Sequence, residues 1–386
     1  MSTRIGRWVE TTVAGEVVRA FVPPPLPPEP PIDVLRLVER LSLAERALGR
    51  LDGVSTILPD QRLFLPMYVR KEAVLSSQIE GTQSTLTDLL RFEADAKAGS
   101  PFDDVGEVSN YVDAMIHGLH RMETLPLSLR LIREMHARLM DGARGADKDP
   151  GEFRRSQNWI GGPRPGTALF VPPPVSELGG CLDALERFLH DDRSRLPALL
   201  KAGLIHVQFE TIHPFLDGNG RIGRLLVTLY LVKEQVLATP LLYLSLYLKA
   251  HRSEYYRLLQ GVRETGGWEA WLEFFLIGVA ETANQAFEAA SRIVDLFKRD
   301  RDRIAASSDR AGSALRLHEI LQVQPFATSK QLGERTGLTA PTVNATLVEL
   351  ERLGIVVEVT GRRRGRVFGY SAYVAILNEG TELPPG

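Results

Sequence analysis

The sequence predicts a mainly α-helical protein that carries one small β-hairpin and a separate C-terminal domain of short helices and strands. Three observations support this fold class. Apolar residues recur at helical spacing along most of the chain, which indicates a bundle of buried and amphipathic helices. A stretch rich in Gly and Pro interrupts this pattern at residues 151–174. A polar segment at residues 305–312 then separates the last part of the chain as a linker.

Composition limits the class of protein before any motif is considered. The chain has 386 residues, of which 44% are hydrophobic and 24% are charged, so it can bury a large core and is expected to hold two or three domains. The formal net charge of −2 argues against general attraction to nucleic acid but leaves room for a local basic patch. Cys181 is the single cysteine, which excludes a disulfide within the chain, and its amphipathic surroundings indicate a core thiol.

No segment has the pattern of a membrane anchor or a leader. Residues 1–15 contain no apolar run of the length that a signal peptide needs. No later stretch approaches the roughly 18 uninterrupted apolar residues of a membrane-spanning helix. We therefore expect a cytoplasmic protein without a membrane partner.

The N-terminal region combines an extended arm with two helices. Residues 19–31 are too rich in Pro for a helix or a central strand and predict an extended polyproline II segment. Such a segment suits an SH3-like partner, but an arm that lies across the helical body needs no partner and is the favoured interpretation. The apolar spacing predicts helices at 32–51 and 63–80.

The densest chemistry of the chain lies at residues 213–224, His-Pro-Phe-Leu-Asp-Gly-Asn-Gly-Arg-Ile-Gly-Arg. Apolar residues at helical spacing precede and follow this segment, so it is a tight turn between two core helices. Its glycines let successive N–H groups face one pocket at the start of the second helix, an arrangement that favours an anion. Arg221 and Arg224 are three residues apart and add two guanidinium groups suited to phosphate oxygens.

His213 and Asp217 do not fit a simple phosphate cradle. A Mg²⁺ ion that bridges Asp217 to phosphates explains the carboxylate, because Mg²⁺ favours oxygen ligands together with substrate phosphates. His213 would then take the proton of an incoming hydroxyl. The alternative is an ordinary helix-start turn with a core histidine and solvated arginines, which the concentration of functional side chains disfavours.

Residues 213–224 resemble the signature of the Fic family, His-x-Phe-x-Asp/Glu-Gly-Asn-Gly-Arg-x-x-Arg, at every fixed position. The resemblance implies a Fic-type helical bundle and a nucleotidyltransferase that moves AMP from ATP to a Ser, Thr or Tyr hydroxyl of a protein. It makes His213 the base and Asp217 the Mg²⁺ ligand. A toxin branch that phosphorylates its target has Lys at the position of Gly220, so the glycine favours AMP transfer. The ATP-binding residues implied in this way are Glu80, His213, Gly218, Asn219, Gly220, Arg221, Ile222, Gly223, Arg224 and Tyr256.

Residues 76–81, Ser-Ser-Gln-Ile-Glu-Gly, end the second predicted helix. Gly81 fits the position after a helix end, and Thr85 with Asp88 predicts a capping box for the next helix. A carboxylate at a helix C-terminus opposes the helix dipole, so Glu80 needs either water or a cationic partner.

The same six residues resemble the inhibitory motif of the Fic family, with Ser76, Glu80 and Gly81 in its fixed positions. The resemblance implies that Glu80 pairs with Arg224 and prevents productive placement of the ATP γ-phosphate. An exposed glutamate at an ordinary helix end is the alternative.

Two further helices and a hairpin are predicted in the middle of the chain. The helices lie at 105–122 and 127–140, and His136 on the second has no other His or Cys at ligand spacing, which argues against a zinc site. Short apolar runs at 158–160 and 168–171 flank a Gly/Pro turn and predict the hairpin. Its free edges suit a target backbone held by strand addition, as in the target-positioning flap of the Fic family, and a purely structural hairpin is equally open.

Aromatic residues between 243 and 275 recur at helical spacing and are mostly expected in the core. The resemblance to the Fic family places Tyr256 at the ATP pocket. A long helix is predicted from 282 to 303, before the linker.

The residues beyond the linker predict a small domain of three helices and two strands, with strands at 355–359 and 367–370. Its second helix starts with a capping box at Thr328 and Gln331, and its third is capped by Thr339. This order resembles the winged helix-turn-helix of bacterial regulators. The third helix is expected to expose Thr342, Asn344 and Thr346, and the wing carries Arg362, Arg363, Arg364 and Arg366. DNA binding and a role in protein docking or dimerisation are equally open.

The predicted domains are an N-terminal arm and inhibitory-helix region at 1–100, a Fic catalytic core at 101–304 and a winged helix-turn-helix at 312–375. We expect a protein adenylyltransferase that uses ATP and Mg²⁺ to modify hydroxyl groups of a target protein and of itself, autoinhibited by Glu80. One alternative is an enzyme that removes AMP at the same site, and another is a DNA-binding regulator whose Fic fold senses nucleotide. The sequence does not specify the target, and it leaves a homodimer open.

Overall fold

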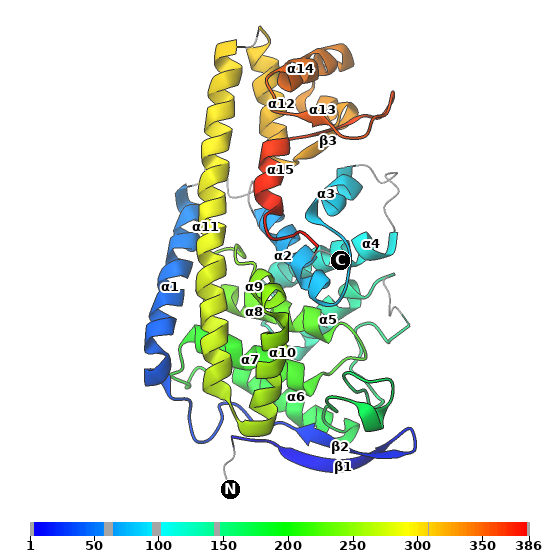
Figure 1. The fold of residues 1–386 in the computed structure, drawn as a ribbon, viewed down its shortest axis with the longest axis vertical. Helices are drawn as coiled ribbons and strands as arrows, with labels where there is room; N and C mark the ends of the chain where they lie inside the picture. Colours follow the sequence, from blue (N-terminus) through cyan, green and yellow to red (C-terminus); the bar gives the residue numbers. More distant parts are fainter. Residues whose placement is uncertain (1–3, 58–64, 95–101, 143–146, 308, 384–386) are drawn as a thin grey trace.

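The computed structural model describes residues 4–57, 65–94, 102–142, 147–307 and 309–383. Helix α11, Trp268–Ser307, runs along the long axis, with the C-terminal domain at one end and a two-stranded N-terminal hairpin at the other (Figure 1). The other helices pack between these two ends, which confirms the mainly α-helical fold class. No helix in the described ranges combines the length and the apolar character that crossing a bilayer requires.

Helix α11 is the spine of the molecule, and α1, Val34–Ile57, lies along it. The sequence predicted this spine only over 282–303. The observed helix starts earlier because no proline interrupts residues 268–307. Gly278 allows a neighbouring helix at 245–250 to pack closely on α11, since a Cβ there would lie 2.5 Å from a ring carbon of Tyr247.

The central bundle contains the predicted helices together with three that the sequence analysis did not place, at 175–189, 245–250 and 252–265. Their bounds are α2 Leu65–Ile79, α3 Leu86–Ala94, α4 Phe102–Arg121, α5 Leu129–Leu139, α6 Val175–Leu189, α7 Ala198–Ile212, α8 Asn219–Lys233, α9 Ser245–Ala250 and α10 Arg252–Thr265. Helix α7 is buried from Leu199 to Ile212 without interruption, which explains why its sequence is apolar on every side. The capping box at the start of α3 is confirmed, because Asp88 N donates to Thr85 Oγ1 and Thr85 N donates to Asp88 Oδ2, at 3.2 and 3.0 Å.

The sequence analysis missed an antiparallel hairpin at the N-terminus, formed by β1, Arg7–Val13, and β2, Glu16–Val22. The two residues of its turn, 14 and 15, have φ values of 49° and 82°, as tight hairpin turns require. Phe21 N donates to Val171 O at 2.9 Å, so the hairpin is joined to the segment that the sequence predicted as a flap.

The segment between residues 158 and 171, predicted as the flap, forms a hairpin with a single antiparallel bridge. Ile160 and Phe170 make one antiparallel bridge, with Ile160 N donating to Phe170 O at 2.8 Å and Phe170 N donating to Ile160 O at 3.1 Å. Its turn contains a short 3₁₀ helix, Pro165–Thr167. Glu16 of β2 accepts a hydrogen bond from Gly166 N at 3.1 Å, so the N-terminal hairpin braces the flap.

Residues 19–22, which the sequence placed in the extended arm, are instead the end of β2, and the rest of the arm contains neither helix nor strand over residues 23–33. The carbonyl oxygen of Pro24 accepts a hydrogen bond from Nε2 of Gln208, a buried residue of α7, at 2.7 Å. The arm therefore lies across the helical body, as the favoured interpretation of the sequence predicted.

The C-terminal domain has the predicted winged helix-turn-helix order. Its elements are α12 Ala311–Val323, β3 Phe326–Thr328, α13 Ser329–Thr336, α14 Ala340–Arg352, β4 Val357–Glu358 and β5 Val367–Gly369. The three strands form an antiparallel sheet in the order β3-β5-β4, in which β3 was not predicted. The capping box at Thr328 and Gln331 is confirmed.

One expectation for the third helix of this domain was wrong. Thr346 is fully buried, because it follows Val343 by three residues and shares its inward face on α14. Asn344 is exposed and Thr342 is half-buried, so these two residues remain available on the outer face.

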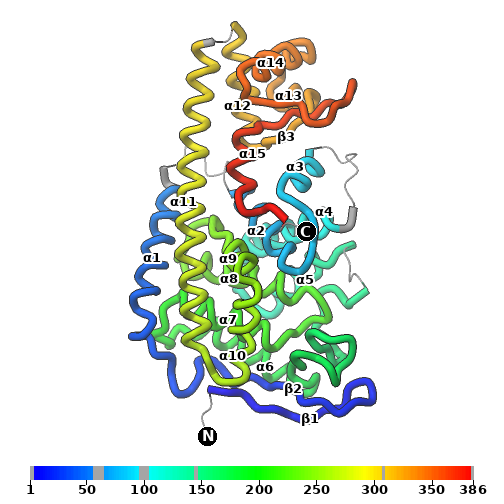
Figure 2. The backbone as a smooth tube through the Cα atoms, in the orientation of Figure 1, coloured from blue at the N-terminus to red at the C-terminus, as the bar shows by residue number. Residues whose placement is uncertain are grey.

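A helix that the sequence analysis did not predict, α15 Ser371–Asn378, follows the sheet and crosses the expected domain end at 375. It packs on α11, α3 and α2, and Figure 2 shows the chain end returning beside α2. The hydroxyl of Tyr370, just before α15, donates to Asp300 Oδ2 of α11 at 2.8 Å. The division into three domains at 1–100, 101–304 and 312–375 stays a prediction.

Candidate active site

Residues 213–218 form the turn between α7 and α8. His213 has a φ of 49° and Gly218 a φ of 74°, so both ends of the turn are left-handed. Asn219 closes the turn, because its Oδ1 accepts from Phe215 N and its Nδ2 donates to Phe215 O, both at 2.9 Å. A non-glycine residue in this conformation is held there by its surroundings, so the position of the His213 side chain is fixed by the turn.

The first turn of α8 begins where the sequence predicted an anion site. The leading N–H groups of a helix have no acceptor within it, and the positive end of the helix dipole lies there. A Cβ on Gly220 would lie 2.3 Å from Glu80 Oε1, and a Cβ on Gly223 would lie 2.4 Å from Glu210 Oε1. Two carboxyl groups therefore approach this helix start so closely that a larger residue at either position would have to move one of them.

Arg224 joins this helix start to the end of α2. Its side chain is buried, and it donates from Nε to Ser76 Oγ at 2.8 Å, from Nη2 to Ser76 O at 3.1 Å and from Nη2 to Glu80 Oε1 at 2.6 Å. Burial acts to raise the pKa of the Glu80 carboxyl, but the Arg224 guanidinium outweighs it and the pKa is lowered. The structure therefore brings the predicted residues Ser76, Glu80 and Arg224 together, with Gly81 directly after them at a φ of 101°.

His213 is a neutral imidazole in this environment. Burial lowers its pKa to about 3, and the nearby guanidinium groups of Arg263 and Arg154 act in the same direction. A backbone hydrogen bond with Glu210 acts in the opposite direction and offsets these effects only in part. An unprotonated imidazole that lines a cavity can accept a proton from a group bound there.

Sequence reasoning missed the two arginines that surround His213. Arg154 is 2% exposed and donates from Nε to the carbonyl oxygen of His213 at 3.0 Å. Arg263 of α10 lies with its guanidinium 3.8 Å from the ring centroid of Phe170 in the flap, and its Nε donates to Thr211 Oγ1 at 3.2 Å. Neither arginine belongs to a local motif, so only the assembled fold reveals them.

Glu210 is a third residue that the sequence analysis did not single out. It is buried one turn before His213, and its Oε1 has no hydrogen bond to any described group. Burial raises its pKa to about 7, against the opposing effect of Arg224. Its position three residues before the histidine in a fully buried helix was the available signal.

Asp217 and Arg221 lie at the outer edge of the turn. The Asp217 side chain is 48% exposed, and its Oδ1 is 3.7 Å from Arg221 Nη2. Arg221 is buried and its Nη1 also lies 3.5 Å from Glu107 Oε2 of α4. In the part of the chain that the structure describes, no group of three or more His, Cys, Asp or Glu residues could hold a metal by itself. A Mg²⁺ ion bound by Asp217 would therefore take its other oxygens from phosphates and water, a donor set that suits this ion.

One cavity of about 680 Å³ is lined by part of the predicted site, whereas Asp217, Gly218, Asn219, Arg221 and Gly223 are not among its lining residues. Its lining includes Glu80, His213, Gly220, Arg224 and Tyr256 from the predicted site, Ile160, Leu169 and Phe170 from the flap, and Glu210 and Arg263. Ile222, also predicted to bind ATP, is instead fully buried, and its N–H donates to Gly218 O at 3.0 Å. The cavity thus has a polar end at the helix start and an apolar wall at the flap, as a nucleotide requires.

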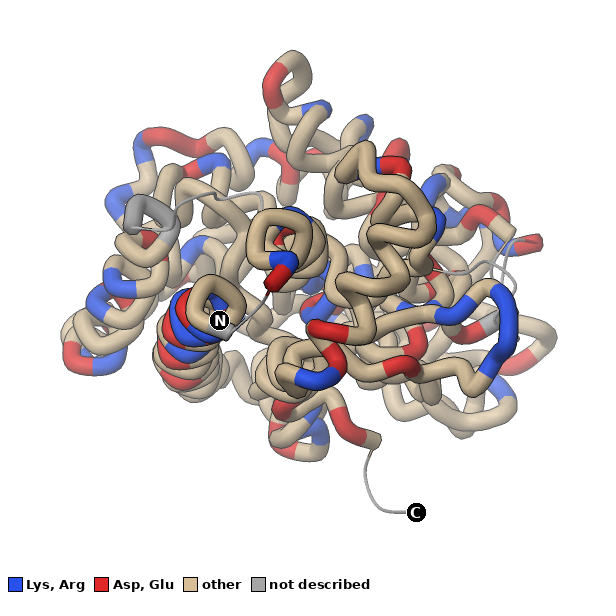
Figure 3. Tube along the Cα trace, turned by 90° about the horizontal axis from the view of Figure 1, so that it is seen from above, with Lys and Arg blue, Asp and Glu red and all other residues tan. Residues whose placement is uncertain are grey.

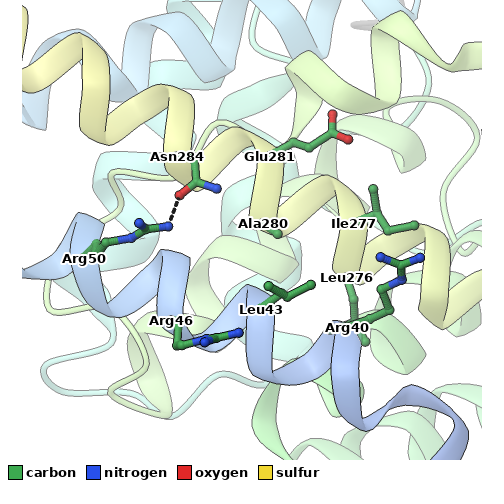
Figure 4. A pocket seen from close by; sticks show the side chains of 9 residues that line it. All are labelled: Arg40, Leu43, Arg46, Arg50, Leu276, Ile277, Ala280, Glu281 and Asn284. Carbon is green, nitrogen blue, oxygen red and sulfur yellow. Dashed lines mark hydrogen bonds between the residues drawn. The ribbon is translucent and has the colours of Figure 1, made fainter.

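Two other regions lie apart from this cavity. A groove between α1 and α11 is lined by Arg40, Arg46 and Arg50 (Figure 4), but it contains none of the predicted site residues. The wing residues at 362–366 are in the C-terminal domain, where Arg362, Arg363 and Arg364 are exposed and Arg366 is half-buried. Acidic and basic positions are otherwise mixed along most of the trace (Figure 3).

Three family models match the chain in sequence order. Residues 38–120 match the Fic/DOC family N-terminal model and residues 126–231 match the Fic/DOC family model. Residues 312–357 match a winged helix-turn-helix DNA-binding model. These matches confirm the resemblance that the motif at 213–224 and the C-terminal pattern predicted.

Curated relatives and solved structures agree with the family models. The chain is 29% identical to a protein adenylyltransferase Fic of Drosophila erecta over 198 residues, which covers 48% of this chain and 35% of the relative. It is 33% identical to the protein of the same name from Drosophila grimshawi over 147 residues, which covers 37% of this chain and 27% of the relative. The matches therefore span about a third of the relatives' length.

Two crystal structures share the fold. A Fic family protein from Desulfovibrio desulfuricans G20 matches with a TM-score of 0.56 and 21% identity, covering 86% of this chain and 95% of its own. A Fic domain containing signaling protein from Bacteroides thetaiotaomicron VPI-5482 matches with a TM-score of 0.50 and 19% identity, covering 64% of this chain and 98% of its own.

Proposed function

We propose that this chain, which carries the Fic/DOC N-terminal region, the Fic/DOC domain and a winged helix-turn-helix domain, is a protein adenylyltransferase. It transfers AMP from ATP to a Ser, Thr or Tyr hydroxyl of a target protein and of itself. The observation that carries the proposal is that a neutral His213 faces the same cavity as the helix start at Gly220 and the Arg224 guanidinium. The relatives named protein adenylyltransferase Fic support the same reaction.

In the reaction, His213 accepts the proton of the target hydroxyl while its oxygen attacks the α-phosphorus of ATP. A bond forms between that oxygen and the α-phosphorus, and the bond from the α-phosphorus to the oxygen that bridges to the β-phosphorus breaks. Pyrophosphate leaves with the electron pair of the broken bond. The leading N–H groups of α8 donate to phosphate oxygens, and because they are already oriented, they stabilise the developing charge without rearranging.

The charged side chains hold the triphosphate. Arg221 and Arg224 are the candidates for the phosphates farther from the ribose, and Tyr256 forms part of the wall beside the base. When bound by Asp217, Mg²⁺ supplies positive charge that stabilises the phosphates in the transition state. The flap residues Leu169 and Phe170 bring an apolar surface to the mouth of the cavity, where a target segment can lie.

Glu80 inhibits this reaction in the proposed account. Its carboxylate occupies the Arg224 guanidinium at 2.6 Å, so the γ-phosphate cannot take the same position. The triphosphate must then settle elsewhere, which moves the α-phosphate out of line with the incoming hydroxyl. A displacement of about 1 Å is enough to reduce the rate roughly a hundredfold.

The C-terminal domain is proposed to bind DNA. The name of its matching model supports this role, as do the exposed Asn344 on α14 and the Arg-rich wing at 362–366. The overall charge of −2 gives little help to such binding, so the contacts would have to be local.

Transfer of label tests the reaction directly. The protein is incubated with Mg²⁺ and with ATP labelled either in the α-phosphate or in the γ-phosphate, and protein-bound label is measured. The proposal predicts stable label from the α-phosphate only. Label from the γ-phosphate would indicate phosphorylation, and binding of ATP without any protein-bound label would favour a nucleotide sensor. Loss of AMP from a previously modified protein in the absence of ATP would favour AMP removal.

A further inference from the structure

Residues 379–382, which we call the C-terminal strap, lie against helix α2 and follow α15 directly. Three carbonyl oxygens of the strap accept hydrogen bonds from long polar side chains of α2 and α9. These bonds join Lys71 Nζ to Glu379 O at 2.7 Å, Gln78 Nε2 to Thr381 O at 2.9 Å and Lys249 Nζ to Glu382 O at 2.7 Å. The strap is thus attached to the helix that carries Ser76 near its end.

The strap is fixed to the rest of the molecule as well. Both carboxylate oxygens of Glu379 accept from the Arg292 guanidinium of α11, at 2.7 and 2.8 Å. Asn378, directly before the strap, donates from Nδ2 to Thr87 Oγ1 of α3 at 2.7 Å, and Thr381 is 1% exposed. The strap is therefore a packed part of the fold that connects the C-terminal domain to α2.

Gln78 joins the strap to the turn at residues 78–84, which carries Glu80. It lies two residues before Glu80, and its Nε2 donates both to Thr381 O and to Ser84 O, each at 2.9 Å. Its Oε1 accepts from Lys249 Nζ at 2.7 Å. One side chain therefore uses both amide hydrogens and the amide oxygen to close the turn at 78–84 and to tie it to the strap and to α9.

The turn is also held by bonds that do not involve the strap, because Thr82 N donates to Ser77 O at 3.2 Å and Gln83 N donates to Asp104 Oδ2 at 2.8 Å. Helix α2 ends at Ile79, and the next two N–H groups make short-range bonds, from Glu80 to Ser77 O at 3.0 Å and from Gly81 to Gln78 O at 3.1 Å. The Glu80 side chain is 38% exposed, so packing alone does not fix it. Its 2.6 Å contact with Arg224 therefore depends on the position of the turn, which Gln78 helps to close.

We propose that Gln78 is a positioning residue for Glu80, and that the C-terminal strap is part of the autoinhibitory apparatus because it holds Gln78. This inference rests on the proposed function, in which Glu80 blocks AMP transfer. When the strap leaves α2, the turn at 78–84 loosens, Glu80 releases Arg224 and the triphosphate takes its productive position. The C-terminal domain thereby acts on the catalytic site through a segment of only a few residues.

Two single substitutions in the full chain test the inference. Gln78→Ala removes the three side-chain bonds at the turn. Gly380→Val displaces the strap without changing α2, because Gly380 has a φ of 81° and a Cβ there would lie 2.6 Å from Leu246 Cδ1. Gly365→Val is the matched control, since Gly365 in the wing has a φ of 66° and no neighbour within 4 Å of its added Cβ. Each substitution is made alone and together with Glu80→Gly.

The measured quantity is the initial rate of AMP transfer. Gln78→Ala and Gly380→Val are each expected to raise it about fivefold or more, the scale of one net hydrogen bond. Gly365→Val leaves the rate at the parent level, and neither test substitution adds to the rate of Glu80→Gly. A rate at or below the parent level for either test variant overturns the inference, as does an increase on top of Glu80→Gly. If Gly380→Val does not fold, Gln78→Ala decides. Failure of the proposed function looks different, because Glu80→Gly itself would then show no transfer.

Discussion

Nη2 of Arg224 lies 2.6 Å from Oε1 of Glu80, although 144 residues separate the two in the sequence. The guanidinium is buried, and Ser76 accepts from its Nε through the hydroxyl and from its Nη2 through the carbonyl oxygen. A cation at the start of a helix is a natural partner for a phosphate, and here a carboxylate of the same chain already occupies it.

Replacing His213, the proposed base, distinguishes its part in catalysis from any part in ATP binding. His213→Ala is expected to abolish AMP transfer while ATP binding changes by less than about threefold, because the imidazole takes a proton and the helix start and arginines hold the phosphates. Equilibrium binding of ATP and transfer of label are measured on the same preparation. His120→Ala, at a side chain that is 81% exposed on α4, is the control. A comparable loss of ATP affinity would contradict the role of His213.

The Glu80–Arg224 pair is tested by a double-mutant cycle. Arg224→Ala alone is expected to lower transfer by roughly tenfold or more, because a charge-assisted contact to phosphate is lost. The variant that combines it with Glu80→Gly should have the rate of Arg224→Ala, since both changes act through one contact. Arg224→Lys keeps the charge and controls for damage to the fold. Additive effects of the two changes would show that Glu80 acts elsewhere.

The wing is tested by its salt dependence. Changing the four wing arginines, 362, 363, 364 and 366, to Ala is expected to remove DNA binding without changing AMP transfer. Binding is measured between low and moderate salt, where each phosphate contact contributes a slope of about 0.9 in the logarithm of the binding constant. Arg193→Ala, at a side chain that is 98% exposed, is the control. Unchanged DNA affinity, or no binding by the parent protein at low salt, would favour a docking role for the domain.

The raised pKa of Glu210 predicts that the stability of the protein depends on pH. Its pKa is raised to about 7 in the folded protein from 4.5, so the folded state holds the proton more tightly than the unfolded state. Ionisation of Glu210 therefore lowers the free energy of unfolding. This loss grows as pH rises above 4.5 and levels off above about 7. Glu210→Gln removes this cost and should increase the free energy of unfolding by about 1–3 kcal/mol more at pH 8 than at pH 5. Urea unfolding at the two pH values measures it. An equal effect of Glu210→Gln on the free energy of unfolding at both pH values would contradict the raised pKa of Glu210.

The parts of the site that could be predicted are local in sequence. The turn at 213–224 was recognised because its glycines, histidine, aspartate and arginines are adjacent, and the end of α2 was recognised because Gly81 and Glu80 stand at a helix end. The relation between these two segments came only from family resemblance. No physical property of either segment alone specifies that they meet.

The parts that could not be predicted depend on contacts between distant segments. Arg263 of α10 stacks on Phe170 of the flap, and Arg154 bonds the carbonyl oxygen of His213. Each is an ordinary arginine in its own sequence surroundings. Thr346 was predicted to be exposed but is buried, because the buried face of α14 is wide enough to include it beside Val343. The strap and α15 carry no motif, and only their packing on α2 reveals them.

The most direct test of the account is the initial rate of AMP transfer by Glu80→Gly compared with the parent protein. With Mg²⁺ and ATP labelled in the α-phosphate, the account predicts an increase of roughly a hundredfold in both self-modification and target modification, because the triphosphate regains its alignment. Glu80→Gly also removes the carboxylate partner of the buried Arg224 guanidinium, so folding of the variant is confirmed before the rates are compared. A folded Glu80→Gly protein that binds ATP and transfers AMP no faster than the parent would contradict the account.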